Sequence, residues 1–340
     1  MRMVWLLGQR VGHFLAVLFL SSLVLTLFLW ASPGSPGKPR VDIDFSTATV
    51  GEPACFDRST CGTLASMPEG VPSTVAIDVG GERVVREARF AREPGPGFVQ
   101  WFFVGFWGGL FQGDVGESTA FLEPALTVVA RGAPYTVGLV FAALIVSVLL
   151  ALILTAVLTW LPFPSLRGAI RSVLLIVSIT PVFILGYMLQ TQGVLPFEMN
   201  ATVLAACVAI LFLGDGNLAE ILLGLEDEVR KLRSRDYIHA ANLRGASLWV
   251  HMLPGLLLPV TSISAAKVAF LLGSVVIAER LFRVPGLGEA SLEAAKEGDV
   301  LLLLTLTVFI TGLVALVALV RDVAEIAIDP RLRRGREDGG

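Results

Sequence analysis

Charged residues are scarce in this sequence. They make up only 16% of its 340 residues, whereas hydrophobic residues make up 54%, and the mean hydropathy is +0.75. A soluble globular domain carries about 25% charged residues, so the composition excludes that class and indicates a polytopic membrane protein. The net charge of -3 indicates nothing by itself about nucleic acid, and we predict no nucleic-acid partner.

The sequence also lacks the residue patterns of common catalytic and nucleotide-binding sites. It has three histidines, and it contains neither a His-Glu-x-x-His motif nor the Gly-x-Ser-x-Gly turn that presents a nucleophilic serine. No Gly-x-x-x-x-Gly-Lys-Ser/Thr loop is present to bind a nucleotide phosphate. We therefore predict no catalytic residue, no metal and no cofactor in this chain.

Long hydrophobic runs are what the sequence does contain. A segment of about 20 apolar residues can cross the roughly 30 Å hydrocarbon core of a membrane, and no alternating pattern of about ten residues indicates a barrel. The predicted fold class is an all-α polytopic membrane protein with six transmembrane helices. The apolar runs that predict them cover residues 11–30, 133–160, 169–190, 201–224, 256–281 and 299–320.

Arginine and lysine predict the orientation of these helices. If the N-terminus is cytoplasmic, most of the basic residues in short segments fall on the cytoplasmic side, and the short outer segments hold only Arg280, Arg283 and Lys296. A cleaved signal peptide is a poor alternative for the first run, which is too long. Both termini are therefore predicted to be cytoplasmic. The predicted regions are a leader with helix 1 (1–30), an extracytoplasmic loop (31–132), a five-helix core (133–320) with a cytoplasmic loop at 225–255, and a cytoplasmic tail (321–340).

The long outer loop has a different composition, rich in proline, glycine and charge. Residues 74–79 and 82–90 alternate between apolar and polar on either side of Gly80-Gly81, which predicts a hairpin within a small β element. The aromatic and glycine-rich residues 98–110 predict a helix at the membrane interface.

The sequence has three cysteines. Cys55 and Cys61 lie close together in the predicted outer loop, on the oxidising side of the membrane, with no histidine or third cysteine nearby to suggest zinc. We predict a disulfide between them; the alternative is two free thiols. Cys207, alone in the fourth apolar run, is predicted to be a buried packing residue.

Polar residues inside the apolar runs are candidates for a translocation path. A charge at a helix centre costs about 2.5 to 3.5 kcal/mol on insertion scales, so it should not face lipid alone. Asp215 and Lys267 lie at similar predicted depths, which favours a buried ion pair between them. The alternative is that Asp215, Asn217 and Glu220 line a water-filled path while Lys267 faces a partner subunit. Glu279 lies too far along its helix to pair with either charge.

One polar-to-amphipathic segment, residues 236–259, lies on the arginine-rich side. Ala240 and Ala241 precede Gly245, and an apolar run then ends at Pro254 and Pro259. Because glycine breaks a helix and proline can open one, the segment predicts a helix, a sharp turn and a second helix. Small residues at the turn would let a partner approach closely; the alternative is an ordinary amphipathic surface helix.

This segment resembles the Glu-Ala-Ala-x-x-x-Gly loop of permeases of binding-protein-dependent ABC importers, with His239 at the position of the glutamate. Asp236-Tyr237 with Ala241 and Gly245 is most similar to the dipeptide/oligopeptide branch. Three further motifs of that family have counterparts in the same order: Gly113-Asp114-Val115-Gly116-Glu117-Ser118 before the second helix, Phe282-Arg283-Val284-Pro285-Gly286-Leu287-Gly288 followed by Asp299 before the last helix, and the terminal Asp329-Pro330-Arg331-Leu332-Arg333.

The resemblance implies a translocation subunit in the bacterial cytoplasmic membrane, for di- or oligopeptides or else nickel or another small solute. It also implies partners: a second homologous permease, two cytoplasmic ABC ATPases that bind ATP and Mg, an extracytoplasmic substrate-binding protein, and the lipid bilayer. The residues that would contact the ATPase are Asp236, Tyr237, His239, Ala240, Ala241, Arg244 and Gly245. The outer turn would use Pro285, Gly286 and Gly288.

Two other classes remain as alternatives. An intramembrane enzyme could use Asp215-Gly216-Asn217, although one carboxylate and one amide are few groups for catalysis. A membrane-anchored scaffold would explain the outer loop but not the segment around Gly245. A permease should co-purify with an ATPase, and neither alternative should.

Overall fold

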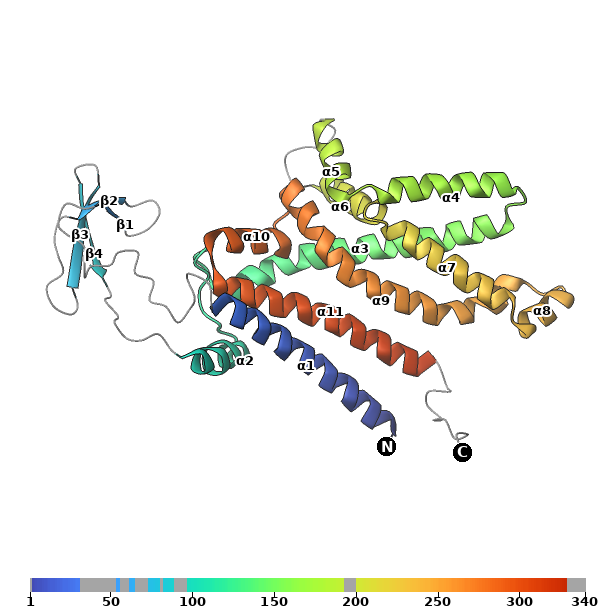
Figure 1. Cartoon of the computed structure of the whole chain (residues 1–340), viewed down its shortest axis with the longest axis horizontal. Coiled ribbons are helices and arrows are strands. Elements are labelled where there is room, and N and C mark those ends of the chain that lie inside the picture. Colours follow the sequence, from blue (N-terminus) through green and yellow to red (C-terminus); the bar gives the residue numbers. More distant parts are fainter. Residues whose placement is uncertain are drawn as a thin grey trace. The chain divides into compact units, whose positions relative to one another are not determined.

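The computed structural model (Figure 1) describes residues 2–30, 97–192 and 200–328, together with the backbone of four short strands between residues 53 and 88. The described part of the chain is mainly helical. It divides into two compact units, of which the first comprises Met1–Leu25 and Gly116–Gly340 and the second comprises Thr26–Val115.

The first unit is a bundle of long helices joined by short connections. Its helices are α1 (Arg2–Trp30, which continues into the second unit), α3 (Ala125–Trp160), α4 (Pro164–Ile179), α5 (Val182–Thr191), α6 (Ala201–Leu213), α7 (Asn217–Arg233), α8 (Asp236–Leu243), α9 (Leu248–Phe282), α10 (Leu287–Glu297) and α11 (Val300–Ile328).

Four of the described helices are long and apolar enough to cross a membrane, and the number rises to six if each of two bent helix pairs is one crossing. The bent pairs are α4 with α5, which meet at 84°, and α6 with α7, which meet at 49°. Large apolar side chains lie on the outside of the bundle; Ile179 is 74% exposed and Ile176 is 69% exposed. Such a surface suits lipid and not water.

The bends correct the prediction of two continuous helices at 169–190 and 201–224. Pro181 has no N–H to donate and disfavours a helical conformation at the preceding Thr180, which is extended. The second break falls at Gly214, Asp215 and Gly216, where Asp215 has a left-handed φ of 51°. Average hydropathy does not register either break, because apolar residues continue on both sides.

Three helix boundaries also differ from the predicted ones. α3 begins at Ala125 and not at residue 133, α9 begins at Leu248 and not at residue 256, and α11 continues to Ile328 through the start of the predicted tail. In each case the helix extends beyond its most apolar part. Hydropathy locates the apolar part of a helix and not its ends.

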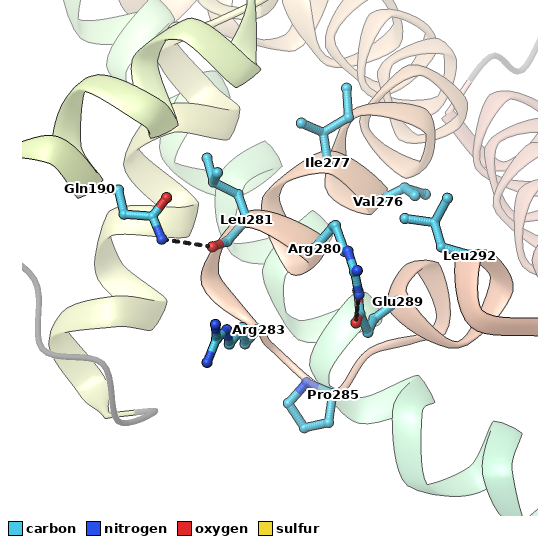
Figure 2. A pocket seen from close by; sticks show the side chains of 9 residues that line it. All are labelled: Gln190, Val276, Ile277, Arg280, Leu281, Arg283, Pro285, Glu289 and Leu292. Carbon is cyan, nitrogen blue, oxygen red and sulfur yellow. Dashed lines mark hydrogen bonds and ion pairs between the residues drawn. The ribbon is translucent and has the colours of Figure 1, made fainter. Parts of the chain in front are cut away.

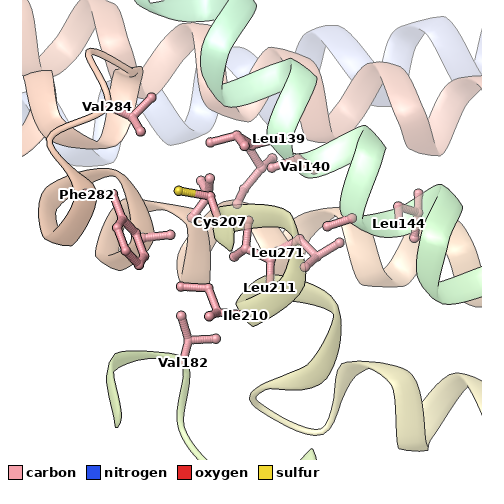
Figure 3. Close-up of a cluster of buried hydrophobic side chains, with 14 of the residues drawn as sticks. Leu139, Val140, Leu144, Val182, Cys207, Ile210, Leu211, Leu271, Phe282 and Val284 are labelled. Atoms are coloured by element: carbon pink, nitrogen blue, oxygen red, sulfur yellow. The ribbon is translucent and has the colours of Figure 1, made fainter. Parts of the chain in front are cut away.

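The largest buried apolar cluster lies where α3, α6 and α9 meet (Figure 3). Cys207 of α6 lies inside it with no exposed surface, which confirms that this cysteine is a packing residue. A second cluster joins α3 to α7 through Leu158, Leu222 and Leu225, each at most 2% exposed. α3 and α9 therefore form the centre of the bundle, and the other helices are placed by their contacts with them.

The second unit contains an antiparallel sheet in the order β1-β2-β3-β4. Its strands are β1 (Pro53–Cys55), β2 (Cys61–Leu64), β3 (Ser73–Val79) and β4 (Glu82–Ala88). The backbone of Cys55 lies opposite that of Cys61. The side chains of these strands lie outside the described residues, so the predicted disulfide stays a prediction.

A short helical segment follows in the same unit, formed by the π-helix η1 (Gln100–Trp107) and α2 (Gly108–Gln112). Aromatic rings hold it together: Phe98 stacks on Phe102 at 5.8 Å between centroids, and Trp101 stacks on Phe106 at 6.2 Å. The predicted position of this segment at a membrane interface stays a prediction.

Candidate functional site

The α8 loop, residues 234–247, connects α7 to α9 and is fixed to both. Ile238 is 2% exposed and packs in a cluster with Val229 of α7 and with Met252 and Leu256 of α9. This apolar contact holds α8 in one orientation. The α8 loop is therefore anchored to both α7 and α9 by buried apolar contacts.

The predicted ATPase-contacting residues fall on two faces of the α8 loop. Asp236, Tyr237, His239, Arg244 and Gly245 are exposed and Ala240 is partly exposed. Ala241, in contrast, is 5% exposed, which corrects its predicted place on the surface. Residues three apart share one face of a helix, and Ala241 follows the buried Ile238 by three. Its small side chain belongs to the packing beneath α8.

The turn after α8 needs a residue with positive φ. Gly245 has φ 69°, and the Ala246 N–H donates to the Ala241 carbonyl at 3.0 Å, the bond that closes a Schellman cap. A Cβ on Gly245 would meet no atom of the chain within 4 Å. Backbone conformation, and not space within the chain, therefore favours glycine here.

The helix after this turn corrects one prediction. α9 begins at Leu248, and Pro254 and Pro259 lie inside it, so neither proline opens the helix. A proline inside a helix removes one hydrogen bond, which destabilises it locally. The burial of Met252 and Leu256 against α8 offsets that cost and keeps the first turns of α9 helical.

The two helix breaks contact each other, and Asp215 lies at their junction. The Asp215 N–H donates to the Thr180 carbonyl at 3.1 Å. Its carboxylate accepts the Val182 N–H at 3.1 Å and the hydroxyl of Ser274, on α9, at 2.7 Å. Val182 opens α5, where the N–H groups have no partner within the helix. Asp215 thus caps α5 and ties both breaks to α9.

Lys267 does not pair with Asp215, which makes that prediction wrong. Its ammonium group forms an ion pair with Glu220 of α7 and lies 4.8 Å from the centre of the Phe270 ring. Equal depth would bring the two charges together only if a straight helix ran through Asp215. Because that residue lies in the break, its side chain points to α5 and α9, and the carboxylate available to Lys267 comes from the first turns of α7.

Asn217 also lies at the break and is fully buried. Its side-chain amide donates to the hydroxyl of Ser147, on α3, at 3.1 Å and to the Leu211 carbonyl at 3.4 Å. Its contacts are those of a link between α7 and α3, and its predicted place on a translocation path stays a prediction.

Glu279 is a fully buried carboxylate at the end of α9. It accepts the hydroxyl of Thr136, on α3, at 2.6 Å, and it accepts the Gly288 and Glu289 N–H groups at 2.7 and 3.2 Å. The Leu287 N–H donates to the same Thr136 hydroxyl oxygen at 2.7 Å. The first N–H groups of α10 are therefore satisfied by a buried carboxylate and hydroxyl.

The outer-turn glycines make this arrangement possible. A Cβ on Gly286 would overlap the Glu279 carboxylate, and one on Gly288 would come within 2.6 Å of the Val276 Cα. The Pro285-Gly286-Leu287-Gly288 motif, expected to form only a turn, also starts a helix against a buried charge. Sequence reasoning missed both α10 and Thr136; a threonine within an apolar run carries no visible signal.

Asp299 forms a third capping site. Its carboxylate accepts the Ser118 hydroxyl and the Thr119 N–H, both at 2.6 Å, the Ala120 N–H at 3.1 Å and the Leu302 N–H at 3.0 Å. Burial alone would raise the pKa of Asp299, but these hydrogen bonds to its charged form outweigh burial and lower the pKa below its ordinary value. Asp299 therefore ties Ser118, the last residue of the Gly-Asp-x-Gly-x-Ser motif, to the start of α11.

We expect Asp299→Asn to destabilise the protein by about 2 kcal/mol at pH 7, because four hydrogen bonds to a charged acceptor are weakened or lost. A lowered folded pKa means that the stabilisation is complete above the unfolded value of about 3.9 and disappears as the pH falls through the folded value. The stability difference between wild type and variant, measured by thermal unfolding in detergent, should be constant from pH 8 to 5. If the stability difference between wild type and Asp299→Asn vanished between pH 7 and 5, the Asp299 carboxylate would not have a lowered pKa in the folded protein.

The ion pair between Glu220 and Lys267 predicts a specific rescue. Glu220→Lys should destabilise the protein by about 1 kcal/mol, because the Glu220 side chain is 62% exposed. Lys267→Glu should cost about 3 kcal/mol, because the Lys267 side chain is only 9% exposed. The double exchange should recover part of this loss in a double-mutant cycle of thermal stability. The matched exchange of Asp215 with Lys267 should recover nothing, and recovery there would restore the first prediction.

Among the described residues, no group of three His, Cys, Asp or Glu side chains is placed to hold a metal ion. The polar groups described above connect helices to one another. These contacts hold the helix breaks and the helix ends in place. The α8 loop lies at one end of α9, and the turn into α10 lies at the other end.

Comparison with known proteins gives the family. A family model described as the binding-protein-dependent transport system inner membrane component matches residues 153–334, more than half of the chain. The chain is 28% identical over 272 residues to a protein named probable peptide ABC transporter permease protein y4tP of Sinorhizobium fredii, covering 73% of this chain and 84% of that protein. It is 24% identical over 241 residues to the nickel import system permease protein NikB of Staphylococcus aureus, covering 69% and 73%.

The matched range begins within α3 and continues past the end of α11, so it contains the α8 loop, both helix breaks and the capping carboxylates of Asp215, Glu279 and Asp299. Membership in this family implies that the chain works with other components of an ABC transporter and is not an enzyme in itself. With its several apolar helices, the chain belongs to the family of binding-protein-dependent transport system inner membrane components and is a multi-pass permease subunit of an ABC importer.

Proposed function

We propose that this permease imports di- or oligopeptides and that separate cytoplasmic ATPases drive it through the α8 loop. The proposal rests on the α8 loop, which has a buried side that packs on the bundle and an exposed side. Ile238 and Ala241 fix it from below, while Tyr237, Arg244 and Gly245 stay exposed. A rigid projection with an exposed turn is suited to receive a force from a partner.

The proposed assembly contains a second homologous permease, two ATPases that bind ATP and Mg, and an extracytoplasmic binding protein. The membrane is crossed six times, with each bent helix pair as one crossing and both termini in the cytoplasm. The excess of arginine and lysine on the side of the α8 loop supports this orientation.

The contacts of α8 suggest how motion would be transmitted. α8 packs against α7 and α9 through Ile238. These two helices are joined deeper in the bundle by the ion pair of Glu220 with Lys267, and Asp215 ties the breaks to α9 through Ser274. A displacement of α8 would therefore move α5, α7 and α9 together, as a rigid-body step between outward-open and inward-open states.

Nickel import is the second candidate, since one relative is named a nickel import permease. The relative named a peptide permease has the higher identity, 28%, and the longer match. We therefore place peptides first.

The test is purification of the tagged chain from its native membrane, followed by uptake assays. An ATPase and a second permease should co-purify, and deletion of the chain should abolish import of radiolabelled tripeptide while leaving nickel import unchanged. Loss of nickel uptake alone would favour the second candidate. Absence of a co-purified ATPase would contradict the coupling.

A further inference from the structure

A cleft of about 730 Å³ opens where the end of α5, the end of α9 and the start of α10 meet (Figure 2). This volume is in the range of small-molecule sites. Its polar lining residues are Gln190, Arg280, Arg283 and Glu289. Its apolar lining residues are Val276, Ile277, Leu281, Pro285 and Leu292.

The described residues that line the cleft include two cations, Arg280 and Arg283, and one carboxylate, Glu289. Arg280 forms an ion pair with Glu289 at 2.5 Å. Arg283 is exposed, and within the described ranges no carboxylate lies within ion-pair distance of it. Figure 2 shows Arg283 apart from that pair, between Gln190 and Pro285. Among the described residues, the cleft therefore offers one guanidinium without a carboxylate partner, that of Arg283, beside an apolar wall.

The backbone of Arg283 has a left-handed conformation. Arg283 has φ 54°, in the left-handed region that glycine or asparagine adopts at lower cost than arginine. The residue that follows is locked, because Val284 is fully buried and its N–H donates to the Glu279 carbonyl at 2.9 Å. This left-handed conformation ends α9 and holds the Arg283 backbone in one place at the cleft.

Gln190 adds a polar group that can adapt. Its amide donates only a long hydrogen bond, 3.4 Å, to the Leu281 carbonyl. A planar guanidinium binds a carboxylate through two parallel hydrogen bonds, and the Gln190 amide could add a third by rotating. A free metal cation would be repelled by the same guanidinium.

We propose that this cleft binds the carboxylate of a small peptide through Arg283, with the apolar side chains of the peptide against Ile277, Leu281 and Leu292. The inference rests on the proposed peptide-import function and assigns to it a contact site within this chain. It also makes a free C-terminal carboxylate part of what the permease recognises.

The experiment uses the full-length chain in nanodiscs and two probes, radiolabelled trileucine and its C-terminal amide, in equilibrium dialysis. The wild-type chain should bind the acid at least tenfold more tightly than the amide. Arg283→Gln should remove this difference, and Arg283→Lys should keep part of it. Lys296→Gln, which removes a cation of α10 that does not line the cleft, should leave the tenfold ratio unchanged.

Equal wild-type affinities for the acid and the amide, an unchanged ratio in Arg283→Gln, or binding of neither probe would each overturn the proposal. The last result would also be expected if a helix of the second permease fills the cleft. Uptake assays distinguish failure of the cleft proposal from failure of the proposed peptide import. Trileucine import without carboxylate-dependent binding would support peptide import and refute carboxylate binding in the cleft. Carboxylate-dependent binding without import in the native membrane would instead refute peptide import.

Discussion

Replacing Gly245 by glutamate is expected to reduce peptide uptake at least tenfold and to weaken ATPase association, while the amount of chain inserted in the membrane stays normal. An L-residue in the left-handed conformation costs about 1 to 2 kcal/mol, and Gly245 has φ 69°. A Cβ at this position meets no atom of the chain within 4 Å, so we expect the steric effect of the glutamate to fall on the partner that docks on the α8 loop.

Two variants separate these causes. Asparagine tolerates the left-handed region, so Gly245→Asn should preserve the turn and show only the effect of an added side chain at the docking surface. Ser234→Glu adds the same negative charge at an exposed position of the α8 loop outside the predicted contact set, and it should retain most uptake. Wild-type uptake and wild-type ATPase association in Gly245→Glu would show that the turn is not a docking surface.

The hydrophobic runs predicted the long apolar helices of the bundle, because burial in lipid requires apolar length, which sequence displays directly. They did not predict the bends. Each bend is set by two or three residues, Pro181 in one pair and Asp215 with its neighbouring glycines in the other, and is held by contacts between the two breaks. Such contacts join residues distant in sequence, so no local pattern reveals them.

For the same reason, the parts of the candidate site that depend on local sequence were predicted, and the parts that depend on distant contacts were not. The α8 turn depends on a local requirement for positive φ, and Gly245 was found from its spacing alone. The pairing of Lys267 depends on where a bent helix places its side chains, and the partner chosen from depth along a straight helix was wrong. The role of Glu279 depends on glycines seven and nine residues later and on Thr136, which is far away in sequence.

Gly288→Ala tests that buried arrangement and should have the largest effect on stability. The added Cβ would lie 2.6 Å from the Val276 Cα and 2.8 Å from a Glu279 carboxylate oxygen, both in fixed surroundings. Overpacking of this kind costs about 3 kcal/mol, and displacement of α10 would also remove the Gly288 and Glu289 hydrogen bonds that Glu279 accepts. We expect a lower midpoint of thermal unfolding in detergent and a low yield of folded chain.

The matched control is Gly273→Ala, in the middle of α9, where an added Cβ meets no atom within 4 Å and the backbone φ is not positive. Alanine is favoured over glycine inside a helix by roughly 0.5 to 1 kcal/mol, so this variant should be as stable as wild type or slightly more stable. If Gly288→Ala unfolds at the same temperature as Gly273→Ala, α10 does not start against the Glu279 carboxylate. Glycine at position 288 would then have no steric reason, and the turn that places Arg283 on the cleft would not be held by the Glu279 carboxylate.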